Sequence, residues 1–370
     1  MVFKLQQITC GYSAFEPLVC CVDSAARKGA PNDNSPPNNN KEIHDRPILG
    51  KTESQFIGSL IDSAESKKAH TKTDGGPPNI TDHPNLGKLP DICGQLDVQK
   101  ITTGDRVPLY EMPWMVILYY NTTSGAKLNC GGTLINEWYV LTAAHCVTFL
   151  GDMVHLDHVI LGEWDVTTDP DCEMVDDGSD RAAESCAPKK KDVGINNIIA
   201  HPGYRPQTLV DDIALIRLAE PADLTLETIS AICLPVTPEL QQSDLVGMYG
   251  QVAGWGVTER WVQSPVLTSV DLRIVSNSDC QQMYRGSPRI HATQICAGGN
   301  SNQDSCVGDS GGPLMYPGLY KKGRDKSEKG VKQVQRGIVS YGPRRCGIGG
   351  IPGVYTNVAY YMDWILNNIS

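Results

Sequence analysis

The sequence of 370 residues contains no run of about 20 apolar residues, the length that a membrane-spanning helix needs. It also has no paired C-x-x-C motifs, which a zinc site built from cysteines would use. Positive charge is not in excess, since 32 Lys and Arg stand against 42 Asp and Glu and give a net charge of −10. This balance argues against nucleic acid or a membrane surface as the main partner, and its simplest role is a solubilising surface.

A secretory signal is also missing, although other features indicate export. The first residues, MVFKLQQITCGYSAFEPLVCC, have no apolar core of about 7–15 residues after a basic end. Yet 13 cysteines favour an oxidising compartment, because a reducing cytosol leaves thiols unbridged. N-x-S/T sequons at Asn79, Asn121 and Asn368 agree with export and glycosylation. We expect a secreted, extracellular protein, and we expect that the N-terminus with its signal peptide is missing from this sequence.

The composition changes along the chain and predicts separate regions. Residues 1–21 are short and carry three cysteines, whereas residues 22–92 are polar and rich in Pro, Asn and Gly. The second region cannot bury enough apolar surface to offset its ordering entropy, so we predict a flexible, disordered linker there. From residue 101 onward, short β-rich runs between turn residues predict antiparallel sheets closed as barrels or sandwiches. The runs are Trp114–Tyr120, Gly132–Ile135, Val159–Leu161, Ile213–Leu218, Gly250–Trp255, Val270–Ile274, Gly337–Tyr341 and Gly353–Val358.

The last segment differs from these runs. In Tyr360–Asn368 the apolar residues recur at helical spacing, which predicts a terminal helix.

Three motifs carry groups that peptide hydrolysis needs. LTAAHC (141–146) contains His145, DDIALIRL (211–218) contains Asp212, and GDSGGP (308–313) contains Ser310. Hydrolysis requires a nucleophile, a base to deprotonate it, a group to orient the base and donors for the oxyanion. Each motif alone has an ordinary explanation, such as a structural histidine or a turn residue. Together, in the order His, Asp, Ser, they match the pattern of chymotrypsin-like proteases.

With these motifs the sequence resembles arthropod clip-domain serine proteases of the chymotrypsin/trypsin family, of the Easter and prophenoloxidase-activating type. The likeness covers residues 101–370 and implies an all-β fold: two antiparallel six-stranded β-barrels with a C-terminal helix. It also implies catalytic roles, with His145 as the general base, Asp212 as the carboxylate that fixes its tautomer and Ser310 as the nucleophile. The neighbouring Asp211 is not the family's carboxylate, because the motif places that residue directly before Ile-Ala-Leu.

The resemblance extends to substrate binding. It implies that the backbone N–H groups of Gly308 and Ser310 form the oxyanion hole. Asp304, six residues before the nucleophile, would lie at the floor of the primary pocket, which Gly342 and Gly353 would leave open. A carboxylate in a narrow slot selects Arg or Lys, because leaving it unpaired is costly.

An activation switch is implied as well. Lys100–Ile101, which ends the predicted activation segment 93–100, resembles the bond that is cleaved in zymogens of this family. The new α-ammonium of Ile101 would pair with Asp309 and order the pocket and oxyanion hole. The sequence departs from many relatives in having Thr-Thr-Gly after Ile101 instead of Val-Gly-Gly. A basic residue before the bond implies an upstream trypsin-like protease as activator, with self-activation as the alternative.

The disulfide pairs also follow from the resemblance. They are Cys130–Cys146, Cys172–Cys186, Cys280–Cys296 and Cys306–Cys346 in the catalytic domain, and Cys93–Cys233 as a tether to the light chain. Cys10, Cys20 and Cys21 remain, and they resemble the last half of a clip domain whose first half is absent. The alternative is that these three cysteines bind another chain.

Catalysis in this family requires no cofactor, but a structural Ca²⁺ ion is a further expectation. The loop from Glu163 overlays on the calcium loop of trypsins, with Glu163 and Glu173 as carboxylate ligands. Asp165 and Thr168 would add backbone carbonyls, and Asp171 is a nearby substitute. Oxygen ligands of this kind suit Ca²⁺.

The resemblance implies extracellular cascades of melanisation or Toll signalling in innate immunity. The expected partners are protein substrates (prophenoloxidase, a cytokine precursor or a downstream protease zymogen), serpin inhibitors and the activating protease. Two alternatives remain. A non-catalytic homologue would usually have lost the nucleophile, and a digestive enzyme would have little use for the linker and the clip remnant.

Overall fold

The described part of the chain contains most of the predicted protease domain. The computed structural model describes residues 75–96, 106–175, 183–257, 262–299, 308–320, 330–343 and 350–370, together with two short strands, β1 (Tyr12–Ser13) and β2 (Glu16–Pro17). The predictions for Cys10, Cys20, Cys21, Lys100, Ile101, Asp304, Cys306 and Cys346 lie outside the described residues.

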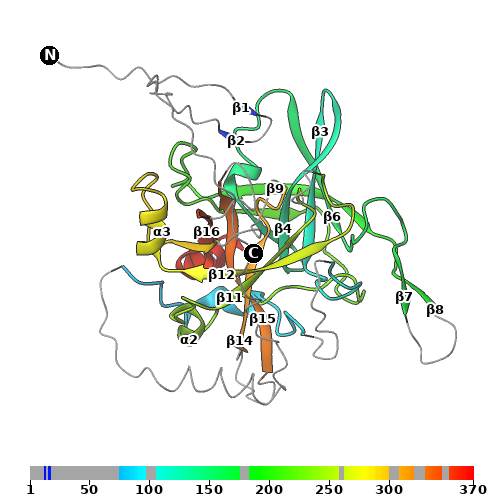
Figure 1. Ribbon diagram of the computed structural model, residues 1–370. Helices are drawn as coiled ribbons and strands as arrows, with labels where there is room; N and C mark the ends of the chain where they lie inside the picture. Colours follow the sequence, from blue (N-terminus) through cyan, green and yellow to red (C-terminus); the bar gives the residue numbers. More distant parts are fainter. Residues whose placement is uncertain are drawn as a thin grey trace, which may run out of the picture.

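The first half of the domain forms a closed antiparallel barrel with the strand order β10-β5-β4-β3-β6-β9 (Figure 1). Runs such as MVILYY in β3 suit strands because β-branched and aromatic side chains pack well on a pleated, buried surface. The strands are β3 (Met115–Thr122), β4 (Gly125–Asn136), β5 (Tyr139–Thr142), β6 (Val154–Leu161), β9 (Lys191–Ala200) and β10 (Ala214–Leu218).

The second half forms another closed barrel, with the order β11-β12-β13-β16-β15-β14. Closure removes the free edges that an open sheet would expose to pairing with other chains. The strands are β11 (Tyr249–Gly254), β12 (Thr268–Val275), β13 (Gln294–Gly298), β14 (Pro313–Tyr320), β15 (Gly330–Tyr341) and β16 (Pro352–Asn357). The predicted all-β fold with two six-stranded barrels is confirmed.

Helices are few and short. They are α2 (Pro238–Gln241), α3 (Asn277–Met283), α4 (Met362–Asn368) and the 3-10 turns η1 (Pro84–Lys88), η3 (Ala144–Cys146) and η4 (Val358–Tyr361). The predicted terminal helix is present, but its first turn is the 3-10 turn η4, which the side chain of Asn357 caps. None of the described helices is long and apolar enough to cross a membrane.

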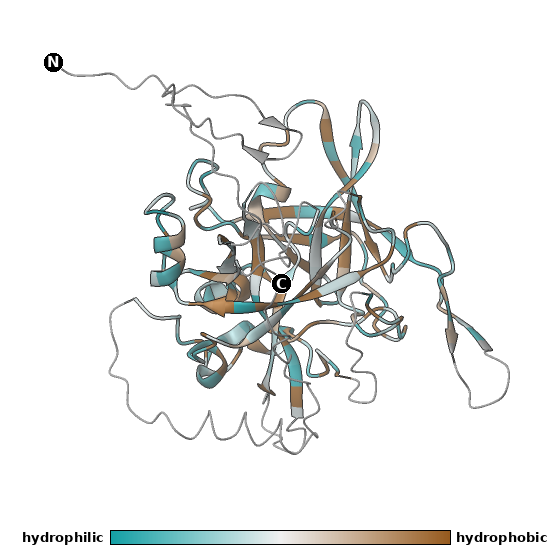
Figure 2. Ribbon diagram, in the orientation of Figure 1, coloured by the Kyte–Doolittle hydropathy of each residue, from teal (hydrophilic) through white to brown (hydrophobic). Residues whose placement is uncertain are grey.

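The barrel interiors form the core. Val116, Leu118 and Tyr120, at every second position of β3, are completely buried. Met362, Ile365 and Leu366 of α4 belong to the same core cluster. Figure 2 shows the strands as largely hydrophobic and the outer loops as largely hydrophilic. This inward packing supplies most of the stabilisation that such a fold needs.

Every predicted β-rich run lies mainly within a strand, but four barrel strands were not predicted. β5 is very short, β9 (KDVGINNIIA) and β13 (QICAG) mix polar or small residues into the pattern, and β14 (PLMYPGLY) contains two prolines. Proline is disfavoured within central strands because it cannot donate a ladder hydrogen bond. These segments form strands because each pairs with strands on both of its sides in a closed barrel, which is a long-range effect.

Residues 75–92 differ from the predicted flexible linker 22–92. Ile80 and Leu89 are 2% and 3% exposed and belong to the main core. The amide of Asn85 in η1 donates to the Leu366 carbonyl of α4 at 2.9 Å, and Cys93 is bonded to Cys233. A few well-placed apolar side chains thus order this polar segment. The remaining linker residues lie outside the described part.

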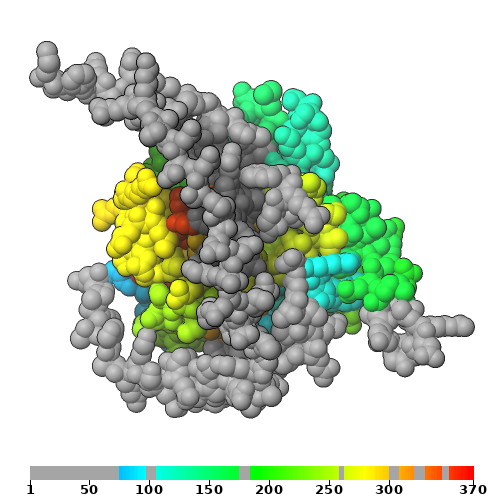
Figure 3. Space-filling view, in the orientation of Figure 1, coloured from blue at the N-terminus to red at the C-terminus, as the bar shows by residue number. Residues whose placement is uncertain are grey.

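A hairpin of β7 (Cys172–Val175) and β8 (Ala183–Cys186) extends away from the barrels at one side (Figure 1). The Cys172–Cys186 disulfide closes its base, where these two residues are also register partners. In the space-filling view, α3 (yellow) lies at the opposite edge from this green region (Figure 3).

Candidate active site

The two barrels contact each other through specific polar and apolar groups. The Trp114 indole N–H donates to the Met315 sulfur at 3.2 Å, and the Thr133 hydroxyl donates to Gln335 Oε1 at 2.6 Å. All of these groups are buried, so they fix one barrel against the other. The three predicted catalytic motifs come from loops at this junction.

Strand register brings His145 and Asp212 together. Ala214 of β10 pairs with Thr142 of β5, so the residues just before β10 and just after β5 lie at the same end of the barrel. His145 Nδ1 lies 2.8 Å from Asp212 Oδ2, and the His145 backbone N–H donates to Asp212 Oδ1 at 2.9 Å. Asp212 is completely buried. Two hydrogen bonds to one carboxylate therefore fix the orientation of the imidazole.

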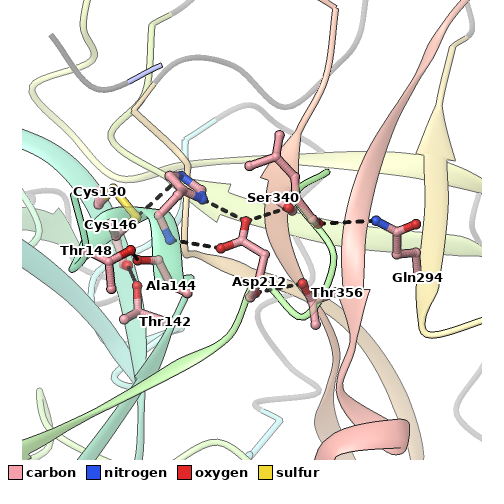
Figure 4. A network of polar contacts seen from close by, with 12 residues as sticks. Cys130, Thr142, Ala144, Cys146, Thr148, Asp212, Gln294, Ser340 and Thr356 are labelled. Atoms are coloured by element: carbon pink, nitrogen blue, oxygen red, sulfur yellow. Dashed lines mark hydrogen bonds and ion pairs between the residues drawn. A yellow bond between two sulfur atoms is a disulfide. The ribbon is translucent and has the colours of Figure 1, made fainter. Parts of the chain in front are cut away.

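Asp212 has further hydrogen-bond partners from the second barrel, one at its carboxylate and one at its backbone carbonyl (Figure 4). Ser340 Oγ donates to Asp212 Oδ2 at 2.6 Å, and the Thr356 hydroxyl donates to the Asp212 backbone carbonyl at 2.7 Å. Asp212 is thereby hydrogen-bonded to groups of both barrels. Sequence reasoning missed both residues. Ser340 stands two residues before Gly342 in VSYG, so the pocket motif carried a local signal for it, whereas Thr356 carried none.

The Ser310 loop packs against the histidine loop. The Gly131 N–H donates to the Ser310 carbonyl at 2.8 Å, and Gly131 follows Cys130, which is bonded to Cys146 beside His145. Gly311 has a φ of 78°, and a Cβ there would lie 2.5 Å from the Gly131 carbonyl oxygen and 3.2 Å from Cys146 Sγ. Only glycine permits this approach. The loop therefore carries Ser310 to the disulfide that adjoins the imidazole.

The residues around Ser310 form a tight turn. Gly308 has a φ of 103°, and Asp309 Oδ1 accepts the Gly256 N–H at 3.0 Å. The Gly311 N–H donates to the Val339 carbonyl at 2.9 Å. These bonds anchor the turn to the second barrel on both sides of Ser310, which leaves the N–H groups of the turn in a fixed arrangement.

The two predicted pocket glycines are neighbours. A Cβ built on Gly342 would lie 3.7 Å from the Gly353 Cα, in ordinary contact. The pairing of Tyr341 with Val354 in β15 and β16 produces this proximity. Asp304, the predicted floor of the pocket, lies outside the described residues.

Asp211 has different partners from Asp212. Its Oδ1 accepts the Tyr361 hydroxyl at 2.7 Å, and its Oδ2 lies 3.9 Å from His201 Nδ1. Burial lowers the pKa of His201, and the nearby Asp211 opposes this shift. The backbone of Asp211 is left-handed, with a φ of 57°. Adjacent carboxylates thus face different groups, and only that of Asp212 is hydrogen-bonded to His145.

Four of the pairs implied by the resemblance are disulfides in the described residues: Cys93–Cys233, Cys130–Cys146, Cys172–Cys186 and Cys280–Cys296. Among the sequons, Asn79 and Asn121 are exposed. Asn368 is half-buried in α4 and donates to the Trp364 carbonyl at 2.8 Å. The first two are therefore the more accessible for glycosylation.

Three of the predicted calcium ligands have other partners in the structure. Glu173 Oε2 accepts the Leu109 N–H at 3.2 Å, and the Asp165 carbonyl accepts the Thr168 N–H at 3.0 Å. Glu163 Oε2 instead lies 3.1 Å from the Lys190 ammonium. Burial raises the pKa of Glu163, and Lys190 lowers it in part. In the described residues, no three side chains of this loop bring carboxylate oxygens together as metal ligands. With the Lys190 ammonium already against one of its two predicted carboxylate ligands, this set of residues does not fit a Ca²⁺ ion.

The paired barrels, with a buried aspartate bonded to a histidine beside a glycine-flanked serine, are characteristic of serine endopeptidases of the chymotrypsin-like class. The family pattern described as Trypsin matches residues 101–365. The chain belongs to this family.

Relatives and a solved structure agree. The chain is 39% identical over 298 residues to "Serine protease ea" of Drosophila melanogaster, covering 79% of this chain and 73% of that protein. It is 40% identical over 290 residues to "Phenoloxidase-activating factor 3" of Holotrichia diomphalia, covering 76% of each. The crystal structure of the Drosophila Grass clip serine protease of the Toll pathway matches with a TM-score of 0.65 and 36% identity, covering 78% of this chain and 76% of that one. The predicted resemblance to clip-domain serine proteases is confirmed.

Proposed function

We propose that the chain is the secreted zymogen of a trypsin-like endopeptidase that cleaves proteins after Arg or Lys in an extracellular cascade. The observation that carries the proposal is the buried Asp212 carboxylate, which His145 and Ser340 both contact beside the Ser310 loop. A buried carboxylate held in this way orients an imidazole for proton transfer.

In the proposed mechanism, Ser310 Oγ attacks the scissile carbonyl carbon and His145 Nε2 takes its proton. Asp212 keeps the proton on Nδ1 and stabilises the imidazolium that forms. The N–H groups of Gly308 and Ser310 donate to the oxyanion. His145 then protonates the leaving amine, which departs from the acyl-enzyme. A water molecule, deprotonated by His145, releases the product acid and restores Ser310.

Specificity for Arg or Lys rests on Asp304 at the pocket floor. The closeness of Gly342 to Gly353 supports an open slot, since neither residue carries a side chain into it. A long cationic side chain fits such a slot and pairs with the carboxylate. An apolar side chain would leave that carboxylate unpaired, at a cost of several kcal/mol (about 3–5).

Activation follows cleavage of the Lys100–Ile101 bond by an upstream trypsin-like protease. The free ammonium of Ile101 then pairs with Asp309. The Asp309 carboxylate contacts Gly256 and lies next to the turn of Gly308 and Ser310, which supports a direct effect on the oxyanion hole. A charge created by proteolysis thereby orders the catalytic turn.

The names of the relatives support a place in innate immunity. One is a phenoloxidase-activating factor, and the solved neighbour acts in the Toll pathway. We infer protein substrates of the same kinds, namely prophenoloxidase, a cytokine precursor or a downstream protease zymogen, with serpins as inhibitors. Glycosylation at Asn79 and Asn121 is consistent with secretion.

Cleavage at Lys100 followed by a peptide assay tests the proposal. The cut protein is expected to hydrolyse Arg and Lys peptides at least about 100-fold faster than Leu peptides, because only a cationic side chain pairs with Asp304. Lys100→Gln is the matched control, since a trypsin-like activator cannot cut it and it should stay inactive. A cut wild-type protein without activity would favour a non-catalytic homologue.

Gly256→Ala is expected to lower kcat/KM of the cut enzyme by about 10²–10³-fold, the effect of losing an oxyanion donor. The added Cβ would lie 2.5 Å from Asp309 Oδ1, so Asp309 and the turn after it must move. Gly194→Ala is the control, because its Cβ would meet only the Ala219 Cβ, at an ordinary 3.5 Å. Equal activity of the two variants would contradict the role of Asp309.

A further inference from the structure

Glu163 is a buried carboxylate at the base of the loop between β6 and β9. Its side chain is 1% exposed, so its charge is removed from solvent. A buried carboxylate needs a compensating cation or directed hydrogen bonds, because desolvation of the charge is costly. Oε1 accepts the Trp164 backbone N–H at 3.0 Å, whereas Oε2 receives no hydrogen bond of good geometry. The second oxygen therefore requires a cation.

Strand pairing supplies that cation from the chain itself. Leu161 of β6 is the register partner of Lys191 of β9, which places Glu163, two residues after Leu161, and Lys190, one residue before Lys191, at the same end of this strand pair. Lys190 Nζ consequently lies 3.1 Å from Glu163 Oε2. Among the residues that the structure describes, Lys190 is the only Lys or Arg within 4.0 Å of this carboxylate.

The second buried carboxylate of the loop is already satisfied by donors. Asp171 Oδ2 accepts the backbone N–H groups of Trp164 and Asp165 at 2.9 and 3.1 Å, and Oδ1 accepts the Thr168 hydroxyl at 2.6 Å. Only the Glu163 oxygen thus depends on a positive charge. One ammonium balances the loop, and a divalent ion would have to displace it.

We propose that the Lys190 ammonium is a built-in substitute for the Ca²⁺ ion that this loop binds in trypsins, so that the described base of the loop, residues 163–172 and 186–190, is held together without metal. The ion pair fastens the base of the loop. The hydrogen bond from the Ala187 N–H to the Asp171 carbonyl at 2.8 Å and the Cys172–Cys186 disulfide close it further out. Protein stability in this region is then independent of calcium.

The ion pair also anchors a connection to the activation region. Trp164, which follows Glu163, accepts the Trp255 indole N–H at its carbonyl at 3.0 Å and donates its own indole N–H to the Val107 carbonyl at 2.7 Å. Trp255 lies between Gly254 and Gly256, and both glycines pack so closely against Asp309 that an added Cβ would clash with its side chain. Movement at the base of the loop would therefore displace Trp164 and, through Trp255, the backbone beside Asp309. The ion pair between Glu163 and Lys190 restrains this movement.

Thermal unfolding of the full uncut chain tests the substitution. About 5 mM CaCl₂, enough for the weak sites of extracellular proteins, is compared with EDTA. The wild-type Tm is expected to be equal in both within about 1 °C, since a ligand that does not bind shifts nothing. Lys190→Ala should lower the Tm by about 5 °C or more in EDTA, because it leaves Glu163 buried without a cation. Lys189→Ala, the exposed neighbour, should leave the Tm unchanged.

A further variant keeps the test decisive if Lys190→Ala does not fold. Glu163→Gln with Lys190→Ala removes both charges and is expected to fold with a higher Tm than Lys190→Ala alone. A wild-type Tm that rises by more than about 3 °C with CaCl₂, or an equal Tm for the two lysine variants, would overturn the proposal. Calorimetry with CaCl₂ on the wild-type protein should record only heats of dilution.

Discussion

Replacing Ser310 with alanine is expected to lower kcat by about 10⁵–10⁶-fold, the scale seen when another Ser-His-Asp protease loses its nucleophile. Without Oγ no acyl-enzyme forms, and the remaining rate comes from the oxyanion donors and from substrate binding. The measurement is kcat of the Lys100-cut variant on an Arg peptide. KM should change little, since Ser310 Oγ contributes to the reacting atoms rather than to the pocket.

The control for Ser310 is the same chemical change elsewhere. Ser278→Ala removes an exposed hydroxyl that lies 2.9 Å from Ser276 Oγ at the start of α3, outside the site. It should retain wild-type activity, and both variants should share the wild-type Tm within a few degrees, as expected for surface-type substitutions (about ±0.5 kcal/mol). Hydrolysis by the Ser310→Ala enzyme at the wild-type rate would refute the mechanism.

Asp212→Asn is expected to lower kcat by about 10⁴-fold, while Asp211→Asn leaves it within about threefold of wild type. Asparagine at 212 can donate to the His145 ring and so favours the wrong tautomer. Asparagine at 211 still accepts the Tyr361 hydroxyl, and Asn tolerates the left-handed backbone found there. The two variants make the same chemical change at adjacent positions.

Comparing the two variants shows whether Asp212 acts by orienting the His145 ring or only by placing a negative charge near it. If the effect of Asp212 were only its charge near His145, the loss at 211 would approach that at 212. Equal losses would therefore contradict the assignment of the Asp212 carboxylate to His145. Both cut enzymes are measured on one Arg peptide between about pH 6 and pH 9. This range includes the ordinary pKa of histidine, about 6.5, near its acid end.

The contact between His145 and Asp212, and the position of the Ser310 loop beside them, agree with the sequence prediction because each residue sits in a short motif with its own local signal. His145 adjoins a cysteine, Asp212 precedes an apolar strand and Ser310 lies among glycines. Their distance of more than 60 residues along the chain is bridged by register, as between Ala214 and Thr142. The supporting bond from Thr356 was not predictable, because nothing in TNVA distinguishes a threonine that bonds to Asp212 from any strand threonine.

Segments that depend on tertiary closure were also missed. β9 contains Gly194 and two asparagines, and it becomes a strand because β6 and β10 pair with it on both sides. Residues 75–92 have a polar composition, but Ile80 and Leu89 fill positions in the core. A prediction from the average composition of a segment does not detect one or two apolar residues that reach the core. The Glu163–Lys190 pair was missed for the same reason, since it arises from register and not from spacing in sequence.

The Cys93–Cys233 bond has a consequence for where proteolysis occurs. It joins residues 140 apart, on either side of the proposed cut, and Gly94 is further held to the Ala231 carbonyl at 2.9 Å. Cutting therefore yields a two-chain enzyme and not two independent fragments. A partner that binds the N-terminal region would therefore also hold the active enzyme. Proteolysis would then stay near that partner, because the enzyme could not diffuse away from it.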